Sequence, residues 1–186
     1  MTTILAVQGD GWAVLGHDSR VSTVNSNGRV YTMQENKIQE NGEYLIGTAG
    51  DLRILNIIAY AFKPPAPPKA NTLLDKFMVS VFIPALRQCL EEHGIPLKDN
   101  GSGADILVAV RGRVYEIGES FEWCTDKSGI YGIGSGAQFG LGSLFTTLKD
   151  KDVSVRMAER AVRKALEIAS ELDSGSGLPV FVITQE

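Results

Sequence analysis

The feature that most constrains the fold is that the expected helices occur in pairs, with groups of strands between the pairs. Apolar runs and alternating patterns predict strands over 3–8, 12–16, 30–32, 37–39, 43–47, 105–110, 113–117, 130–133 and 179–184. Helical spacing predicts helices over 52–62, from 71 or 72 to 93, from after 136 to 148, and over 153–172. A doubly wound parallel sheet needs single helices between strands, so this order argues against it. It favours an α/β (α+β) chain folded as a four-layer αββα sandwich of two stacked, mainly antiparallel sheets.

Short local signals predict several connections. Asp10-Gly11 and Arg111-Gly112 are typical of tight turns between paired strands. The stretch 63–69, KPPAPPK, excludes a helix or a central strand because proline lacks the amide donor. Pro84 is expected to kink the second helix or to bend it toward a partner. The strand over 43–47 is expected to end before the first helix.

Length and composition indicate one domain, spanning 1–186, with a sizeable core. The net charge is −4 and basic residues do not cluster, which argues against nucleic acid as a partner. The sequence has neither a basic N-terminal segment nor a long apolar one, so we expect no secretion signal and no membrane span. Cys89 and Cys124 lack the spacing of a metal site and fit a reducing compartment, so the expected location is the cytoplasm.

Three candidate motifs have simpler explanations than catalysis. His17-Asp18-Ser19 contains the residue types of a hydrolase triad, but adjacent strand residues point to opposite faces and cannot converge. His93, near a helix end, fits the favourable helix dipole. The glycine-rich string at 132–137 lies between a strand and a helix, but a dinucleotide site needs a strand after that helix, and another helix follows.

The first residues, Met1-Thr2-Thr3, carry the most informative chemical signal. Methionine aminopeptidase removes Met1 when the next side chain is small, which leaves Thr2 with a free α-amine beside its hydroxyl. That pair can act as nucleophile and base, because an α-amine titrates near pH ~8.

Asp18 and Lys37 are charged residues flanked by apolar strand sequence. A lysine held inward needs a carboxylate partner, and Asp18 is the candidate.

An ordered series of short segments extends along nearly the whole chain. The segments are Thr2-Thr3-Ile4, Asp10-Gly11, Asp18-Ser19-Arg20, Lys37-Ile38, Thr48-Ala49-Gly50, Gly134-Ser135-Gly136 and Asp173-x-x-Ser176-Gly177. In this order and at this spacing, the chain resembles the proteasome β-subunit and its bacterial relative HslV, the N-terminal threonine peptidases. The fold of that family, the Ntn-hydrolase αββα sandwich, agrees with the order of elements. The stretch between Arg20 and Lys37 is longer than is usual in the family.

The resemblance implies catalytic roles for six residues. The Thr2 hydroxyl attacks the scissile carbonyl, and the Thr2 amine accepts and returns the proton. Lys37, as an ammonium, lowers the pKa of the neighbouring amine and hydroxyl, and Asp18 holds Lys37 in place. The residues that position the amine and a water are Ser135, Asp173 and Ser176.

The resemblance also implies how substrate is held. The backbone N–H of Gly50 stabilises the oxyanion, and comparable donors contribute roughly 3–4 kcal/mol. Val21 and Ser22, together with Thr48 and Ala49, line a cleft that binds the substrate as an added strand. No metal and no cofactor are expected.

The implied function is that of an endopeptidase in a proteasome-like core of homo-oligomeric stacked rings, activated by removal of Met1. Protein and peptide substrates follow from this, and an ATP-dependent unfoldase is the implied partner. Two alternatives stay open. One is a catalytically inactive structural ring subunit that retains Met1. The other is a small-molecule amidohydrolase on the same fold, which would not need rings.

Overall fold

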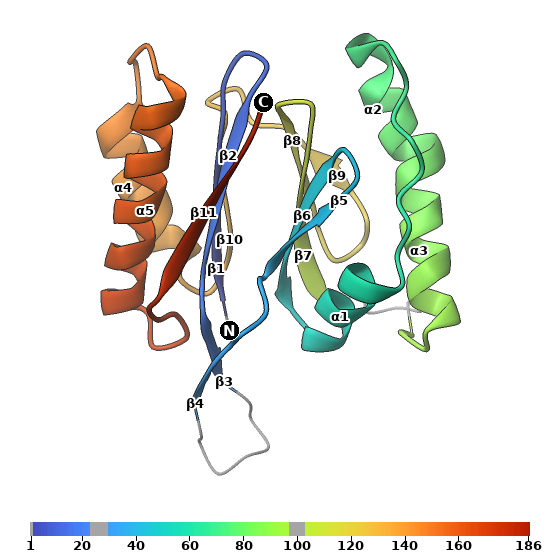
Figure 1. The fold of residues 1–186 in the computed structure, drawn as a ribbon, viewed down its shortest axis with the longest axis horizontal. Coiled ribbons are helices and arrows are strands. Elements are labelled where there is room, and N and C mark those ends of the chain that lie inside the picture. The colour runs from blue at the N-terminus through green and yellow to red at the C-terminus, as the bar shows by residue number, and fades with distance from the viewer. Residues whose placement is uncertain (1, 23–29, 97–102) are drawn as a thin grey trace.

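The computed structural model describes residues 2–22, 30–96 and 103–186, which form two stacked sheets (Figure 1). One sheet has the order β10-β1-β2-β11 and the other the order β5-β6-β7-β8-β9, with antiparallel pairing throughout. The strands of the first sheet are β1 (Thr3–Gln8), β2 (Ala13–Asp18), β10 (Ile130–Gly134) and β11 (Val180–Gln185). Those of the second are β5 (Ile38–Asn41), β6 (Tyr44–Gly50), β7 (Ala104–Val110), β8 (Arg113–Ile117) and β9 (Trp123–Cys124). A separate ribbon pairs β3 (Arg20–Ser22) with β4 (Val30–Thr32).

Helices cover the outer face of each sheet (Figure 1). On the first sheet lie α4 (Ala137–Leu148) and α5 (Val155–Leu172). The second is covered by α1 (Leu52–Tyr60), α2 (Leu74–Phe77) and α3 (Ile83–Glu92). The predicted four-layer αββα sandwich is therefore confirmed. None of the described helices is long and apolar enough to cross a membrane.

Each interface between layers has its own apolar core. Between the sheets, β1 and β2 contribute Ile4 and Leu15, and β7 contributes Leu107. Leu5 and Val14, on the opposite face of β1 and β2, pack against α4 and α5. A third cluster joins the second sheet to α1–α3. Both faces of β1 and β2 are thus buried, which explains their nearly continuous apolar sequence.

The expected connections are largely present. Arg111 and Gly112 have φ values of 49° and 74°, so both lie in the left-handed region that a tight hairpin requires. The stretch 63–69 contains no helix or strand. A π-helical segment, Met78–Phe82, comes just before Pro84, which lies in the first turn of α3. Because Pro84 has no N–H to donate to the preceding turn, the hydrogen-bond pattern of the helix changes just before it.

The residues at which the strands end were predicted less accurately than the presence of the strands. β6 runs on to Gly50 rather than ending at 47, because its pairing with β7 continues to Gly50 and Ala104. β2 extends to Asp18 because Asp18 pairs with Val180 of β11. β3 and β9 were not predicted, and both are short strands defined by a partner. The predicted loop 22–28 lies mostly outside the described residues.

Gly16 of β2 is expected to be a strict packing position. A Cβ there would lie 2.6 Å from Val162 Cγ1 and 2.7 Å from Leu166 Cδ1, both on α5. Gly16→Val should therefore lower the free energy of unfolding by about 1–3 kcal/mol through overpacking. Gly142→Ala is the control, because nothing lies within 4 Å of its added Cβ. This helical site should gain up to ~1 kcal/mol. Equal stability of the two variants in chemical denaturation would contradict the packing described here.

Candidate active site

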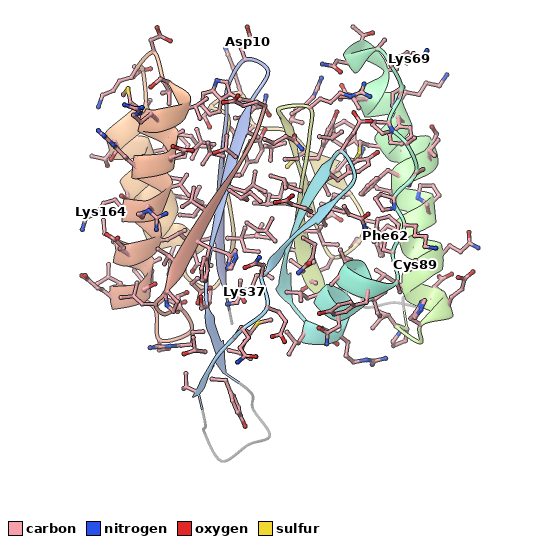
Figure 2. All side chains as sticks on the ribbon, viewed as in Figure 1. Asp10, Lys37, Phe62, Lys69, Cys89 and Lys164 are labelled. Carbon is pink, nitrogen blue, oxygen red and sulfur yellow. The ribbon has the colours of Figure 1, made fainter. Side chains whose placement is uncertain are left out.

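The candidate site lies where many chain segments start or stop at one end of the sandwich. β1 begins there with Thr3, and its partner β2 ends there with Asp18. β10 and β6 end at the same place, at Gly134 and Gly50, and Lys37 precedes β5. In Figure 2, Lys37 lies between the sheets, away from the hairpin at Asp10. Antiparallel pairing thus gathers residues that are far apart in the sequence.

A fully buried carboxylate, that of Asp18, organises this end of the sandwich. Its Oδ1 accepts hydrogen bonds from Thr3 N and from Lys37 Nζ, both at 2.8 Å. Its Oδ2 accepts from Arg20 N and from Gly177 N, both at 2.9 Å. Four donors from four chain segments therefore compensate the cost of burying the charge.

The partner of this carboxylate, Lys37, is only 1% exposed. Besides Asp18, its ammonium donates to the backbone oxygen of Arg20 at 2.7 Å. Burial lowers the pKa of Lys37, while the Asp18 charge opposes that shift. The predicted pairing of Asp18 with Lys37 is present. Since Thr3 N donates to the same oxygen as Lys37 Nζ, the ammonium lies within two hydrogen-bond lengths of the Thr2–Thr3 peptide.

A chain of hydroxyls leads from the same strand to a second carboxylate. Ser176 Oγ donates to Asp173 Oδ2 at 2.6 Å and lies 2.5 Å from Thr3 Oγ1. Because the Ser176 proton is used on Asp173, the Thr3 hydroxyl is the donor to Ser176. Ser135 Oγ donates to the same Asp173 oxygen at 2.7 Å. Burial raises the pKa of Asp173, but hydrogen bonds from the two serines and from the backbone of Gly175 contribute to lowering it, and this pKa is lowered overall.

Two glycines allow β1 to approach the turn before α4. A Cβ on Gly134, whose φ is +90°, would overlap the carbonyl oxygen of Thr2 and would lie 3.2 Å from Ala49 Cβ. A Cβ on Gly136 would overlap Thr3 Oγ1. The glycine-rich string is thus explained by close packing. α4 is followed directly by α5, so the strand that a dinucleotide unit requires is absent from this described segment.

The expected oxyanion residue, Gly50, lies at the end of β6, close to the start of β1. Its φ is +135°, and a Cβ there would overlap Gly103 O, so the backbone conformation requires glycine. Ala49, one residue earlier, packs towards Gly134 beside Thr2. Thr2 itself is buried, with 8% exposure. The end of β6 therefore lies next to the start of β1.

The expected cleft residues lie on two elements beside the site. Val21 and Ser22 belong to β3, where Val21 pairs with Tyr31 of β4. Thr48 is on β6, and its N–H donates to the backbone oxygen of Lys37 at 3.3 Å. Among the described residues, the buried Thr48 Oγ1 has no hydrogen-bond partner.

The triad-like string was correctly rejected. The His17 ring stacks against Phe181 with centroids 5.4 Å apart, whereas the Asp18 carboxylate faces Lys37. Ser19 Oγ donates to Pro179 O at 2.5 Å, so the three side chains diverge. Burial lowers the pKa of His17. His93 lies at the end of α3, as the dipole explanation expects, and its Nδ1 donates to Cys89 O at 2.8 Å.

The sequence reasoning missed five contributors to the site. They are the Thr3 hydroxyl and four backbone groups, namely the N–H groups of Thr3, Arg20 and Gly177 and the carbonyl oxygen of Arg20. Thr3 was considered only as part of the N-terminal motif. The type of a residue does not indicate whether its backbone N–H or carbonyl oxygen will make a hydrogen bond in a site. The Arg20 guanidinium also donates to Ser174 O at 3.1 Å, which fixes the 173–177 loop to β3.

Within the described ranges, no group of three or more His, Cys, Asp or Glu side chains is placed to hold a metal ion.

Comparison with known proteins places the fold. No protein-family model matches the chain, and no curated protein matches it. Among solved structures, Thiobacillus denitrificans BPH in complex with Epoxomicin matches with a TM-score of 0.79 and 23% identity, covering 100% of this chain and 98% of that chain. Another structure of Thiobacillus denitrificans BPH has a TM-score of 0.78, with the same identity and coverage. Eukaryotic HslV from Trypanosoma brucei has a TM-score of 0.66 and 22% identity over 98% of both chains. The chain therefore has the HslV fold, and the resemblance to the proteasome β-subunit and HslV is confirmed at the level of the fold.

The Asp18 carboxylate should be one of the most costly side chains to remove. Asp18→Ala would leave the buried Lys37 ammonium and three backbone N–H groups without their acceptor, so we expect a loss of ~3–5 kcal/mol in the free energy of unfolding. Glu43→Ala is the control, because Glu43 pairs with Arg111 at the exposed surface and such pairs contribute about 0–1 kcal/mol. Similar losses for the two variants in urea denaturation would refute the role given to Asp18.

The lowered pKa of Asp173 predicts a pH dependence of stability. A carboxyl whose pKa is lower in the folded state stabilises the fold above its ordinary value of 3.8, and this contribution disappears as the pH falls through the folded-state pKa. Asp173→Asn should therefore lower the melting temperature at pH 6, and the gap to the unmodified protein should narrow below about pH 4. A gap that stays constant from pH 6 to pH 3 would show that the charge of Asp173 contributes nothing.

Proposed function

We propose that this protein is an N-terminal threonine endopeptidase in which Thr2, exposed by removal of Met1, is the nucleophile. The observation that carries the proposal is the sharing of Asp18 Oδ1 by Thr3 N and Lys37 Nζ, because it sets an ammonium beside the first peptide of β1. The Thr3 hydroxyl already donates to Ser176, which leaves Thr2 as the reacting threonine. Met1 lies outside the described residues.

The proposed reaction needs only groups of this chain and water. The Thr2 amine takes the proton from the Thr2 hydroxyl as its oxygen attacks the scissile carbonyl. The amine then gives that proton to the departing nitrogen of the substrate, which leaves an ester on Thr2. A water molecule, activated by the same amine, hydrolyses the ester and restores the hydroxyl.

The surrounding residues have supporting roles in this reaction. The Lys37 ammonium lowers the pKa of the Thr2 amine and hydroxyl, and Asp18 holds that ammonium in place. The Gly50 N–H stabilises the oxyanion of the tetrahedral intermediate. The positioning of the amine and the attacking water is assigned to three residues, Ser135, Asp173 and Ser176.

The substrate is proposed to bind as an extended strand between β3 and the end of β6. Backbone groups of Val21 and Ser22 would pair with it on one side. Thr48 and Ala49 would line the other side. We also propose that this site accommodates epoxomicin, the ligand in one of the solved structures with this fold.

We further propose that copies of the chain assemble into stacked rings in the cytoplasm and receive unfolded protein from an ATP-dependent unfoldase. The likeness of fold to HslV over nearly the whole of both chains supports this assembly. A ring would confine the sites to an inner chamber and so limit cleavage to unfolded protein.

Hydrolysis of fluorogenic peptides tests the proposed nucleophile. Thr2→Ala should lower the rate by at least ~1,000-fold, because it removes the attacking oxygen while keeping a small residue that permits removal of Met1. Thr2→Ser keeps a hydroxyl and should retain measurable activity. Cleavage by Thr2→Ala at the unmodified rate would refute Thr2 as the nucleophile. A protein that retains Met1 and cleaves no peptide would favour the inactive structural subunit.

A further inference from the structure

Opposite edges of the sandwich carry opposite charge. At one edge lie β11 and β5, the edge strands of the two sheets, together with α5 (Figure 1). A cavity lined by residues of both strands, including Ile38 and Ile183, shows that these two strands flank the same edge. The other edge is formed by β10, β9 and α4. There the hydroxyl of Tyr131, on β10, accepts from the N–H of Asp126, just after β9.

The β11 edge carries a cationic groove. A cavity of about 360 Å³ between α5 and β11 is lined by three arginines, one glutamate and a valine. They are Arg156, Arg160, Arg163, Glu159 and Val182. The arginines recur at helical spacing along one face of α5. In the part of the chain that the structure describes, none of their guanidinium groups lies within 4.0 Å of a carboxylate.

The β9 edge carries an acidic cluster made of Asp105, Glu116, Glu119, Glu122 and Asp126. Glu116 of β8 pairs with Cys124 of β9, and the turn between these strands is closed by a hydrogen bond from Gly118 N to Glu122 O at 2.9 Å. Burial raises the pKa of Asp105, and the charges of Glu119 and Glu122 raise it further. Burial likewise raises the pKa of Glu116, with added repulsion from Asp105 and Asp126. Of the ion pairs among described residues, none includes a member of this cluster. Asp126 accepts hydrogen bonds from the backbone N–H and the hydroxyl of Ser128, but among the described residues no cationic side chain lies within 4.0 Å of any carboxylate of the cluster.

We propose that the cationic groove of one copy of this chain docks on the acidic cluster of the next copy. The two surfaces lie on opposite edges, so the contact is head-to-tail, and repeating it builds a ring when the rotation between successive copies closes. This inference rests on the homo-oligomeric part of the proposed function and assigns the surfaces that make it.

Two further observations favour a second copy as the occupant. The acidic cluster of another copy can pair with the arginines of the groove. No other kind of molecule is therefore needed to neutralise the charge of either surface. β11 is also an edge strand, and Phe181 and Leu178 beside the groove are 47% and 63% exposed. A contact along this edge would cover apolar surface as well as pair charges.

Charge reversal tests the contact. At low salt the unmodified protein should have the native mass of an oligomer in light scattering. R160E/R163E and E119R/E122R should each shift the native mass towards that of a single chain, because like charges then face each other. K69E/K76E is the matched control, since both lysines are exposed and lie far along the chain from either surface. It should keep the native mass.

Two rescue experiments separate loss of the contact from loss of the fold. An equimolar mixture of the two double variants should regain the oligomer, because each cationic surface then meets an anionic one. The quadruple variant R160E/R163E/E119R/E122R, which keeps the net charge, should regain it alone. Oligomers that persist in both double variants, failure of both rescues, or an unmodified protein that is monomeric at every concentration would overturn the proposal. Native mass does not depend on cleavage, so the interface and the peptidase activity can fail separately.

Discussion

The burial of the Asp18 carboxylate is the constraint on which this end of the structure depends. A fully buried charge is stable only with good hydrogen bonds, and its four donors come from β1, from the start of β3, from Lys37 and from the 173–177 loop. Each donor lies on a different segment, so satisfying one carboxylate fixes the relative position of all four. Lys37 is likewise tolerated in the interior only because Asp18 and the Arg20 carbonyl accept from it.

The two threonines after Met1 have different surroundings, and the proposed mechanism depends on that difference. The Thr3 hydroxyl is committed to Ser176 and through it to Asp173, so Thr3 anchors the strand. Thr2 precedes the anchor, with its carbonyl oxygen against Gly134, and the Lys37 ammonium donates to the same Asp18 oxygen as Thr3 N. An anchored second residue and a nearby cation are what a reactive N-terminal residue requires, because its amine and hydroxyl must be held in one geometry.

The fold was predictable from the sequence because hydrophobic periodicity and turn residues act locally. The paired helices gave the four layers, and the need of a buried lysine for a carboxylate gave the Asp18–Lys37 pair. The extension of β6 to Gly50 and the short β9 were not predictable, because partner strands decide them. The Arg20 carbonyl and the Gly177 N–H were missed because every residue has such groups, and only the three-dimensional structure selects which ones face Asp18.

The central claim is that Thr2 becomes a free N-terminal residue in a site built to activate it. The intact mass of the protein from its native host, before and after treatment with an electrophile that needs both a free threonine amine and its hydroxyl, tests this most directly. The account predicts a mass that lacks Met1 and a gain of one electrophile per chain, with the gain much slower in Lys37→Met. A chain that retains Met1, or that lacks Met1 and gains no electrophile, would contradict it.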